Sequence, residues 1–81
     1  MAEGKVLIAD DEKSMCKYLS IMLKKEGYEV DTVHDGKDAI EKIKEGGVDV
    51  VMTDIRMKEV DGLEVLSAAR EAEPNLPVVI M

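Results

Sequence analysis

The chain has 81 residues, enough for one small domain or part of one. Hydrophobic residues make up 46% and charged residues 36%, a balance that is typical of globular domains and excludes a disordered chain. The formal charge of −7 argues against the basic stripe with which proteins bind nucleic acid or anionic membranes, so we expect neither partner. An acidic chain of this kind suits a site that gathers cations or a surface that meets a basic partner.

The cysteine count and the hydropathy pattern bear on the compartment. A single cysteine, Cys16, excludes an internal disulfide and a cysteine-based zinc site. No apolar run approaches the roughly 18–20 residues of a membrane span, and the apolar stretch after residues 1–5 is too short for a signal peptide. We therefore expect a protein of a reducing compartment, the cytoplasm.

The first half of the chain predicts a strand, a helix and a second strand. Residues 6–9 form a continuous apolar run, typical of a strand buried on both faces. Residues 13–26 predict a helix that ends at Gly27. Its apolar residues recur at spacings of three and four: Met15, Cys16, Leu19, Met22 and Leu23. Residues 28–33 alternate apolar with polar, which predicts an edge strand with one exposed face.

The second half repeats the pattern. Residues 37–45 predict a helix with Asp35 as its N-cap and with Gly46 and Gly47 at its end. Residues 50–52 predict a second buried strand, and residues 78–81 a last one. Between them, residues 63–72 predict a helix that cannot continue through Pro74. The side chains on its successive turns are Leu63, Leu66, Ala69 and Arg70.

The predicted order is therefore β-α-β-α-β-α-β. Strands that alternate with helices predict an α/β fold, in which a parallel sheet with right-handed crossovers carries helices on both faces. The connections are short, as in one compact domain.

Carboxylates follow two of the buried strands. Asp10 and Asp11 come directly after the first strand, and Asp54 comes after the third. In open parallel sheets, ligands bind outside the carboxyl ends of the strands, so these residues converge if the two strands are neighbours. Three adjacent carboxylates repel one another, and a hard divalent cation such as Mg²⁺ relieves that repulsion. The alternative is that Asp11 or Glu12 only favours the N-terminus of the following helix.

Four segments together resemble the receiver domain of bacterial response regulators, and most closely the receivers of NtrC-type transcriptional activators. They are VLIADDE at 6–12, VVMTDIRM at 50–57, VDGLE at 60–64 and LPVVIM at 76–81. The resemblance extends over the whole chain. It implies a flavodoxin-like sheet with strand order 2-1-3-4. Residues 1–81 match the N-terminal two thirds of a single receiver domain.

The resemblance also implies an aspartyl-phosphate switch rather than an enzyme. Asp54 matches the phosphoacceptor, Asp11 the acid that binds Mg²⁺ directly, and Asp10 the acid that reaches the ion through water. Arg56 matches the position whose backbone carbonyl completes the metal shell, and Mn²⁺ is a possible substitute for Mg²⁺. The implied partner is a sensor histidine kinase, and the implied output is regulation of transcription.

Two departures from the family pattern are evident. Lys58 stands where the family usually has proline, which predicts a looser loop after Asp54. The switch Ser or Thr and the lysine of the family have no counterpart within residues 1–81, so we expect poor phosphorylation of this chain.

Cys16 is expected in the core and His34 in an exposed loop.

Two other functions compete with a phosphoacceptor. A Mg²⁺-dependent phosphatase with an aspartyl nucleophile would need Asp-x-Asp after an early strand, whereas Arg56 stands two residues after Asp54. A truncated receiver that does not signal would keep all three acids and act only as an interaction module. Whether or not the receiver signals, residues 78–81 predict an exposed apolar strand. We therefore expect a homodimer through Leu76–Met81 and the neighbouring helix surfaces.

Overall fold

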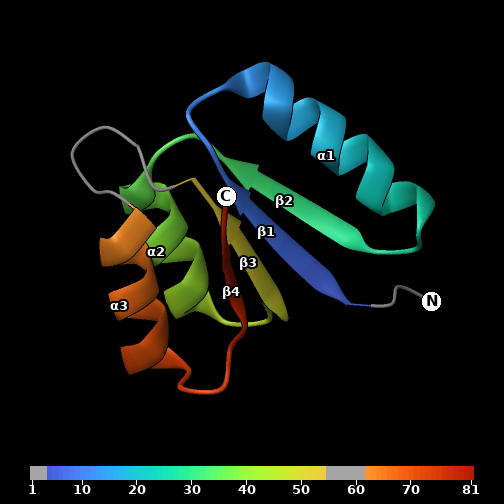
Figure 1. Cartoon of the computed structure of the whole chain (residues 1–81). Coiled ribbons are helices and arrows are strands. Elements are labelled where there is room, and N and C mark those ends of the chain that lie inside the picture. Colours follow the sequence, from blue (N-terminus) through green and yellow to red (C-terminus); the bar gives the residue numbers. More distant parts are fainter. Residues whose placement is uncertain (1–3, 55–61) are drawn as a thin grey trace.

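The computed structural model describes residues 4–54 and 62–81, which form one parallel sheet and three helices (Figure 1). The sheet order is β2-β1-β3-β4, so the predicted parallel α/β topology is confirmed. The strands are β1 (Lys5–Ala9), β2 (Glu29–Val33), β3 (Val50–Thr53) and β4 (Val78–Ile80). The helices are α1 (Lys13–Lys25), α2 (Gly36–Glu45) and α3 (Gly62–Ala72).

The apolar patterns of β1 and β2 account for their positions, whereas β4, predicted as a buried strand, lies at an edge of the described sheet with Val79 and Ile80 exposed, since it pairs on one side only. β1 lies in the interior of the sheet, where Val6 pairs with Val30 of β2 on one side and with Val50 of β3 on the other. Both faces of β1 are covered, and Val6 through Ala9 are accordingly buried. β2 lies at one edge, as its alternating sequence predicts.

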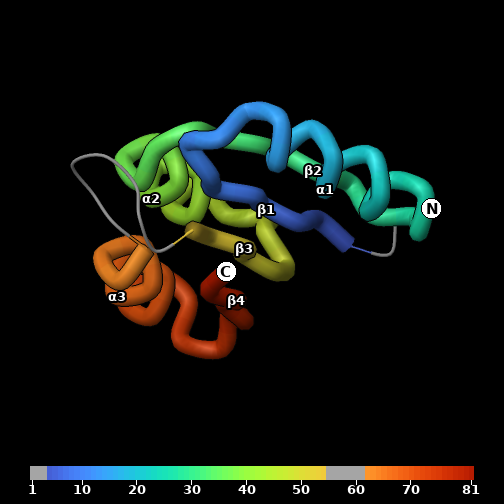
Figure 2. Tube along the Cα trace, turned by 45° about the horizontal axis from the view of Figure 1, so that its top comes forward, coloured from blue at the N-terminus to red at the C-terminus, as the bar shows by residue number. Residues whose placement is uncertain are grey.

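Each face of the sheet packs against its own helices, α1 on one side and α2 with α3 on the other (Figure 2). On the α1 face, Val6 and Ile8 form a buried cluster with Cys16. On the opposite face, alternate residues of the strands pack against both helices, with Leu7, Val51, Ile43 and Val65 among the buried side chains. Within the described residues, no helix is both long and apolar enough to cross a membrane.

The helix ends match the predicted signals. The Asp35 carboxylate accepts a hydrogen bond from the backbone N–H of Asp38 at 2.8 Å, which caps α2. After α1, Gly27 has a φ of +96°, a conformation that glycine adopts without steric cost.

The helical pattern overstates the burial of three apolar side chains. Met15 and Met22 of α1 are exposed, and Leu63 of α3 retains 56% of its accessible surface. In α3 the fully buried positions are Val65 and Ala69. Each helix carries an apolar stripe that is wider than its contact with the sheet, so the outer members of the stripe remain in solvent.

Arg70 does not belong to the packed face of α3 either. Its Nη1 donates hydrogen bonds to the backbone carbonyls of Pro74 at 3.1 Å and Leu76 at 3.3 Å. This guanidinium closes the turn that carries the chain from α3 into β4, and Leu76 itself is buried.

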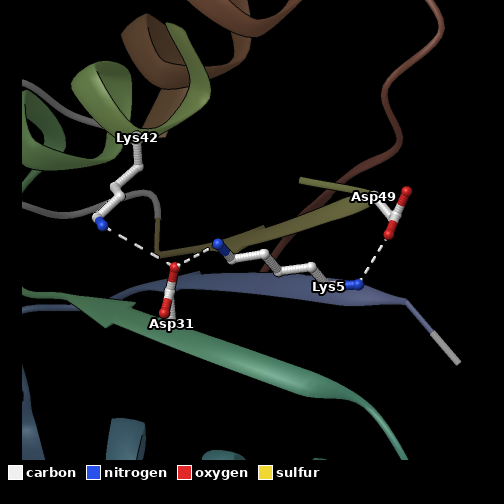
Figure 3. Close-up of polar contacts among 4 residues, drawn as sticks. All are labelled: Lys5, Asp31, Lys42 and Asp49. Atoms are coloured by element: carbon white, nitrogen blue, oxygen red, sulfur yellow. Dashed lines mark hydrogen bonds and ion pairs between the residues drawn. The ribbon is translucent and has the colours of Figure 1, made fainter. Parts of the chain in front are cut away.

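Polar contacts join the amino-terminal end of β1 to its neighbours (Figure 3). Lys5 Nζ lies 3.0 Å from Asp31 Oδ2 of β2, and Lys42 Nζ of α2 lies 3.9 Å from the same oxygen. The backbone N–H of Lys5 donates to Asp49 Oδ2 at 2.8 Å, just before β3. The hydrogen bond and the charge of the Asp31 carboxylate raise the pKa of the Lys5 ammonium.

Candidate functional site

The three predicted acids stand at the carboxyl ends of β1 and β3, which are neighbours in the sheet. The backbone N–H of Asp54 donates to the carbonyl of Ala9 at 2.9 Å, and that of Asp10 donates to the carbonyl of Val33 at 3.1 Å. These bonds continue the strand pairing past the ends of the strands. The backbone of the sheet therefore fixes where the Asp10 and Asp54 side chains start.

Asp10, Asp11 and Asp54 form one acidic cluster, the site that the sequence predicts. Each offers a carboxylate oxygen, and these oxygens all lie within 4.8 Å of one another. Asp10 is buried, Asp54 is half-buried and Asp11 is exposed. Oxygen donors from three carboxylates, graded from the interior to the solvent, fit a hard divalent ion that keeps some of its water.

The charge on Asp10 is costly in the absence of a cation. Its side chain retains only 5% of its accessible surface, and burial raises the pKa of its carboxyl above the ordinary value. The charges of Asp54 and Asp11 raise the pKa further, while a hydrogen bond from the Glu12 N–H to Asp10 Oδ1 at 2.9 Å opposes the shift. A bound divalent cation would stabilise the ionised form of all three acids.

Two residues beneath the cluster were not predicted to belong to it. Cys16 Sγ donates to the carbonyl oxygen of Asp10 at 3.3 Å, and His34 Nδ1 lies 3.2 Å from the same oxygen. Cys16 is buried and His34 is exposed, as expected, but the two side chains also approach each other to 3.7 Å. They come from α1 and from the loop after β2, so no short motif in the sequence joins them to Asp10.

A third unpredicted residue is Thr53, which is fully buried in the strand position before Asp54. Its hydroxyl donates to the backbone carbonyl of Asp54 at 3.1 Å. This contact satisfies a buried hydroxyl and steadies the backbone at the end of β3. The predicted contributions of Arg56 and Lys58 lie outside the described residues.

The geometry agrees with a comparison against known families. The model of the response regulator receiver domain matches residues 6–81. The chain belongs to the response regulator receiver family. The predicted family is thereby confirmed, and with it the assignment of the four-stranded sheet to the receiver fold.

Among curated proteins, this receiver is similar to transcriptional regulators. It is 41% identical over 76 residues to the transcriptional regulatory protein ZraR of Klebsiella oxytoca. The aligned residues cover 94% of this chain and 17% of ZraR. It is 38% identical over 77 residues to the transcriptional regulatory protein TrcR of Mycobacterium tuberculosis, covering 95% of this chain and 30% of TrcR. The chain thus spans less than a third of either relative.

Solved receivers share its fold closely. The receiver domain of the sensor histidine kinase PA1611 from Pseudomonas aeruginosa superposes with a TM-score of 0.90 at 25% identity, over 98% of this chain and 66% of that one. That structure holds a magnesium ion coordinated in its active-site cleft.

Proposed function

We propose that this receiver accepts a phosphoryl group on Asp54 from a phosphohistidine of a sensor histidine kinase, with Mg²⁺ bound at the acidic cluster. The observation that carries the proposal is the approach of the Asp10, Asp11 and Asp54 carboxylate oxygens to within 4.8 Å of one another. The cluster stands at the carboxyl ends of adjacent parallel strands, where such sheets bind their ligands. Magnesium in the cleft of the PA1611 receiver supports the choice of metal.

The proposed transfer uses Asp54 as a nucleophile. One carboxylate oxygen of Asp54 forms a bond to phosphorus while the phosphorus–nitrogen bond of the phosphohistidine breaks and the imidazole nitrogen keeps the electron pair. The product is an acyl phosphate on Asp54. When bound, the metal neutralises charge on the phosphate oxygens, which is the main requirement of phosphoryl transfer.

The other two acids have separate roles in this proposal. Asp11 is exposed and would bind the metal directly. Asp10 is buried, and its Oδ1 already accepts the Glu12 N–H, so it would act on the metal through water. The backbone carbonyl of Arg56 is the fourth proposed protein ligand. Mn²⁺, which also takes oxygen ligands, would substitute for Mg²⁺.

The proposed role is that of a stoichiometric switch and not of an enzyme that turns over a substrate. The similarity to ZraR and TrcR supports transcription as the regulated output. The cytoplasm is the proposed compartment because the chain has a single cysteine, which is typical of a reducing environment. We further propose that residues 1–81 correspond to the N-terminal two thirds of a single receiver domain. Alignment with 66% of the PA1611 receiver supports that correspondence.

Labelling with acetyl phosphate tests the proposed function without knowledge of the kinase. The chain is incubated with acetyl phosphate and Mg²⁺, and its intact mass is measured over time. We expect a slow gain of one phosphoryl group that requires the metal and is lost in Asp54→Asn. Asp38→Asn, which removes an exposed carboxylate on α2, is the matched control and should label like the parent chain. Labelling that persists in Asp54→Asn, or that is unchanged when Mg²⁺ is removed, would refute the proposal.

A second candidate function is self-association through β4. Among the described residues, β4 pairs only with β3, and Val79 retains 47% of its accessible surface, with Ile80 and Met81 also exposed. An apolar edge strand is a template for strand addition, and a second copy of the chain offers the same edge. Light scattering at micromolar concentration should then detect a dimer that Val79→Lys dissociates. A monomer of 8.9 kDa, unchanged by Val79→Lys, would exclude it.

A further inference from the structure

A second surface begins beside the acidic cluster, at Cys16 and His34, and carries the opposite charge to the chain as a whole. A groove of about 360 Å³ runs between α1 and β2. Its lining includes three lysines, a histidine and two hydroxyl side chains: Lys13, Lys17, Lys24, His34, Ser20 and Thr32. None of the described residues that line it is acidic, although the chain carries a net charge of −7. A groove of this charge is complementary to an anionic ligand.

The lysines are spread along the groove. Lys13, Lys17 and Lys24 lie at spacings of four and seven residues on α1, which places them along one side of the helix. At 1.5 Å per residue, the row from Lys13 to Lys24 is about 16 Å long. A single phosphate cannot contact both ends of such a row, whereas an extended ligand can. In the described parts of the chain, these three lysines form no ion pair.

Thr32 of β2 lines the groove opposite α1, and its strand has backbone hydrogen-bonding groups at its outer edge. The N–H of Glu29 donates to the carbonyl of Gly4, and the carbonyl of Val33 accepts from Asp10, so these alternate residues of β2 point toward β1. The N–H and carbonyl groups of Val30 and Thr32 therefore point to the outer edge. Within residues 4–54 and 62–81, no strand pairs with that edge.

Neither acidic side chain of β2 opposes an anion in this groove, because Glu29 and Asp31 alternate with Val30 and Thr32 and lie on the other face of the strand. Asp31 points to the opposite face of the sheet, where Lys5 and Lys42 pair with it (Figure 3). Thr32, one residue on, points to the α1 face and lines the groove. At Thr32, β2 and the lysine row therefore border the same groove.

We propose that the groove binds an extended acidic segment of a partner protein. The segment would add as a strand to the outer edge of β2, with its backbone bonded to Val30 and Thr32. About five extended residues at 3.3 Å each match the length of the lysine row, and alternate carboxylates would face the lysines. This interaction uses neither Asp54 nor a metal, so it stands independently of the proposed phosphoryl transfer.

A capped peptide of alternating glutamate and threonine provides the test. It is titrated into the ¹⁵N-labelled chain at low salt, and the backbone amide signals are followed by NMR. We expect saturable shifts at Val30, Thr32 and the α1 lysines. Lys17→Glu should weaken binding about tenfold, because it reverses one charge in the middle of the row. Lys44→Glu makes the same change at an exposed position of α2 and should alter binding less than about twofold, as expected for a distant charge.

Three results would overturn the proposal. The first is a titration without saturation, or one in which Lys44→Glu weakens binding as much as Lys17→Glu, since either shows general charge attraction only. The second is unchanged affinity for a peptide N-methylated at alternate residues, which cannot pair as a strand. The third is pyrophosphate that reproduces the shifts at the lysines while the peptide leaves the β2 amides unmoved, which indicates a small-anion site.

Discussion

The thiol of Cys16 donates a hydrogen bond to the backbone carbonyl of Asp10, with 3.3 Å between Sγ and the oxygen. Cys16 also packs against Val6 and Ile8 on the α1 face of the sheet. One buried side chain therefore joins the core to the backbone of the most buried acid in the cluster. Burial, followed by the charge of Asp10, raises the pKa of this thiol, so it stays protonated and keeps its donor at neutral pH.

Cys16→Ala should lower the free energy of unfolding by about 1–2 kcal/mol, because it removes a buried atom and a hydrogen bond together. Cys16→Ser retains a donor at the same place and should cost less. Urea unfolding of the two variants separates the contributions. If the serine variant is the less stable of the two, the thiol contributes through packing and not through its hydrogen bond.

Asp10→Asn should stabilise the chain when no divalent metal is present. The folded state holds the Asp10 proton to a higher pH than the unfolded state does, because the pKa is raised from its ordinary 3.8. Over the interval above that value the folded state binds more protons, so its stability falls as the pH rises. The asparagine variant lacks this loss, and its amide oxygen can still accept the Glu12 N–H.

The difference in the free energy of unfolding between Asp10→Asn and the parent chain should therefore grow from about pH 4 upward and then level off. We expect a rise in the unfolding midpoint of roughly 4–8 °C at pH 7, which corresponds to about 1 kcal/mol in a domain of this size. Thermal melts in EDTA across this pH range provide the measurement. A difference that does not depend on pH would show that the carboxyl charge is not the cause.

Mg²⁺ affinity should depend more on Asp11 than on Asp10. Asp11→Asn removes the proposed direct ligand and should weaken binding about tenfold, or 1.4 kcal/mol, with a smaller effect for Asp10→Asn. NMR titration with Mg²⁺ measures both variants, and Asp38→Asn serves as the control for a lost surface charge. Equal and negligible effects of the two cluster variants would contradict the assigned roles.

Asp35→Ala should destabilise the chain by about 1 kcal/mol, because it removes the N-cap of α2. Asp35→Asn keeps an oxygen that can accept the Asp38 N–H and should stay within a few tenths of a kcal/mol of the parent. Chemical unfolding monitored by circular dichroism distinguishes them. Equal losses in both variants would assign the effect to charge and not to the cap.

Much of the fold can be predicted from local patterns of apolar and polar residues in the sequence. The continuous apolar run of β1 and the alternation in β2 distinguish an interior strand from an edge strand. The convergence of Asp10 and Asp54 then needs only the pairing of β1 with β3, which the parallel order supplies.

Other features depend on tertiary packing and have no local signal. The contact of Cys16 and His34 with the Asp10 carbonyl depends on how α1 and the loop after β2 lie against the end of β1. The exposure of Met15 and Leu63 depends on how much of each helix the sheet covers, which the helical period does not encode. The groove between α1 and β2 combines lysines and strand edges from separate elements, and spacing alone shows only a charged helix face.

The central claim is that Asp54 carries the phosphoryl group, and identification of the modified residue tests it most directly. Borohydride reduces an aspartyl phosphate to homoserine, which peptide mass spectrometry locates in the sequence. After treatment with acetyl phosphate and Mg²⁺, the account predicts homoserine in place of Asp54, and none when the metal is omitted. Homoserine in place of Asp10 or Asp11, or a phosphorylated chain with Asp54 intact, would contradict it.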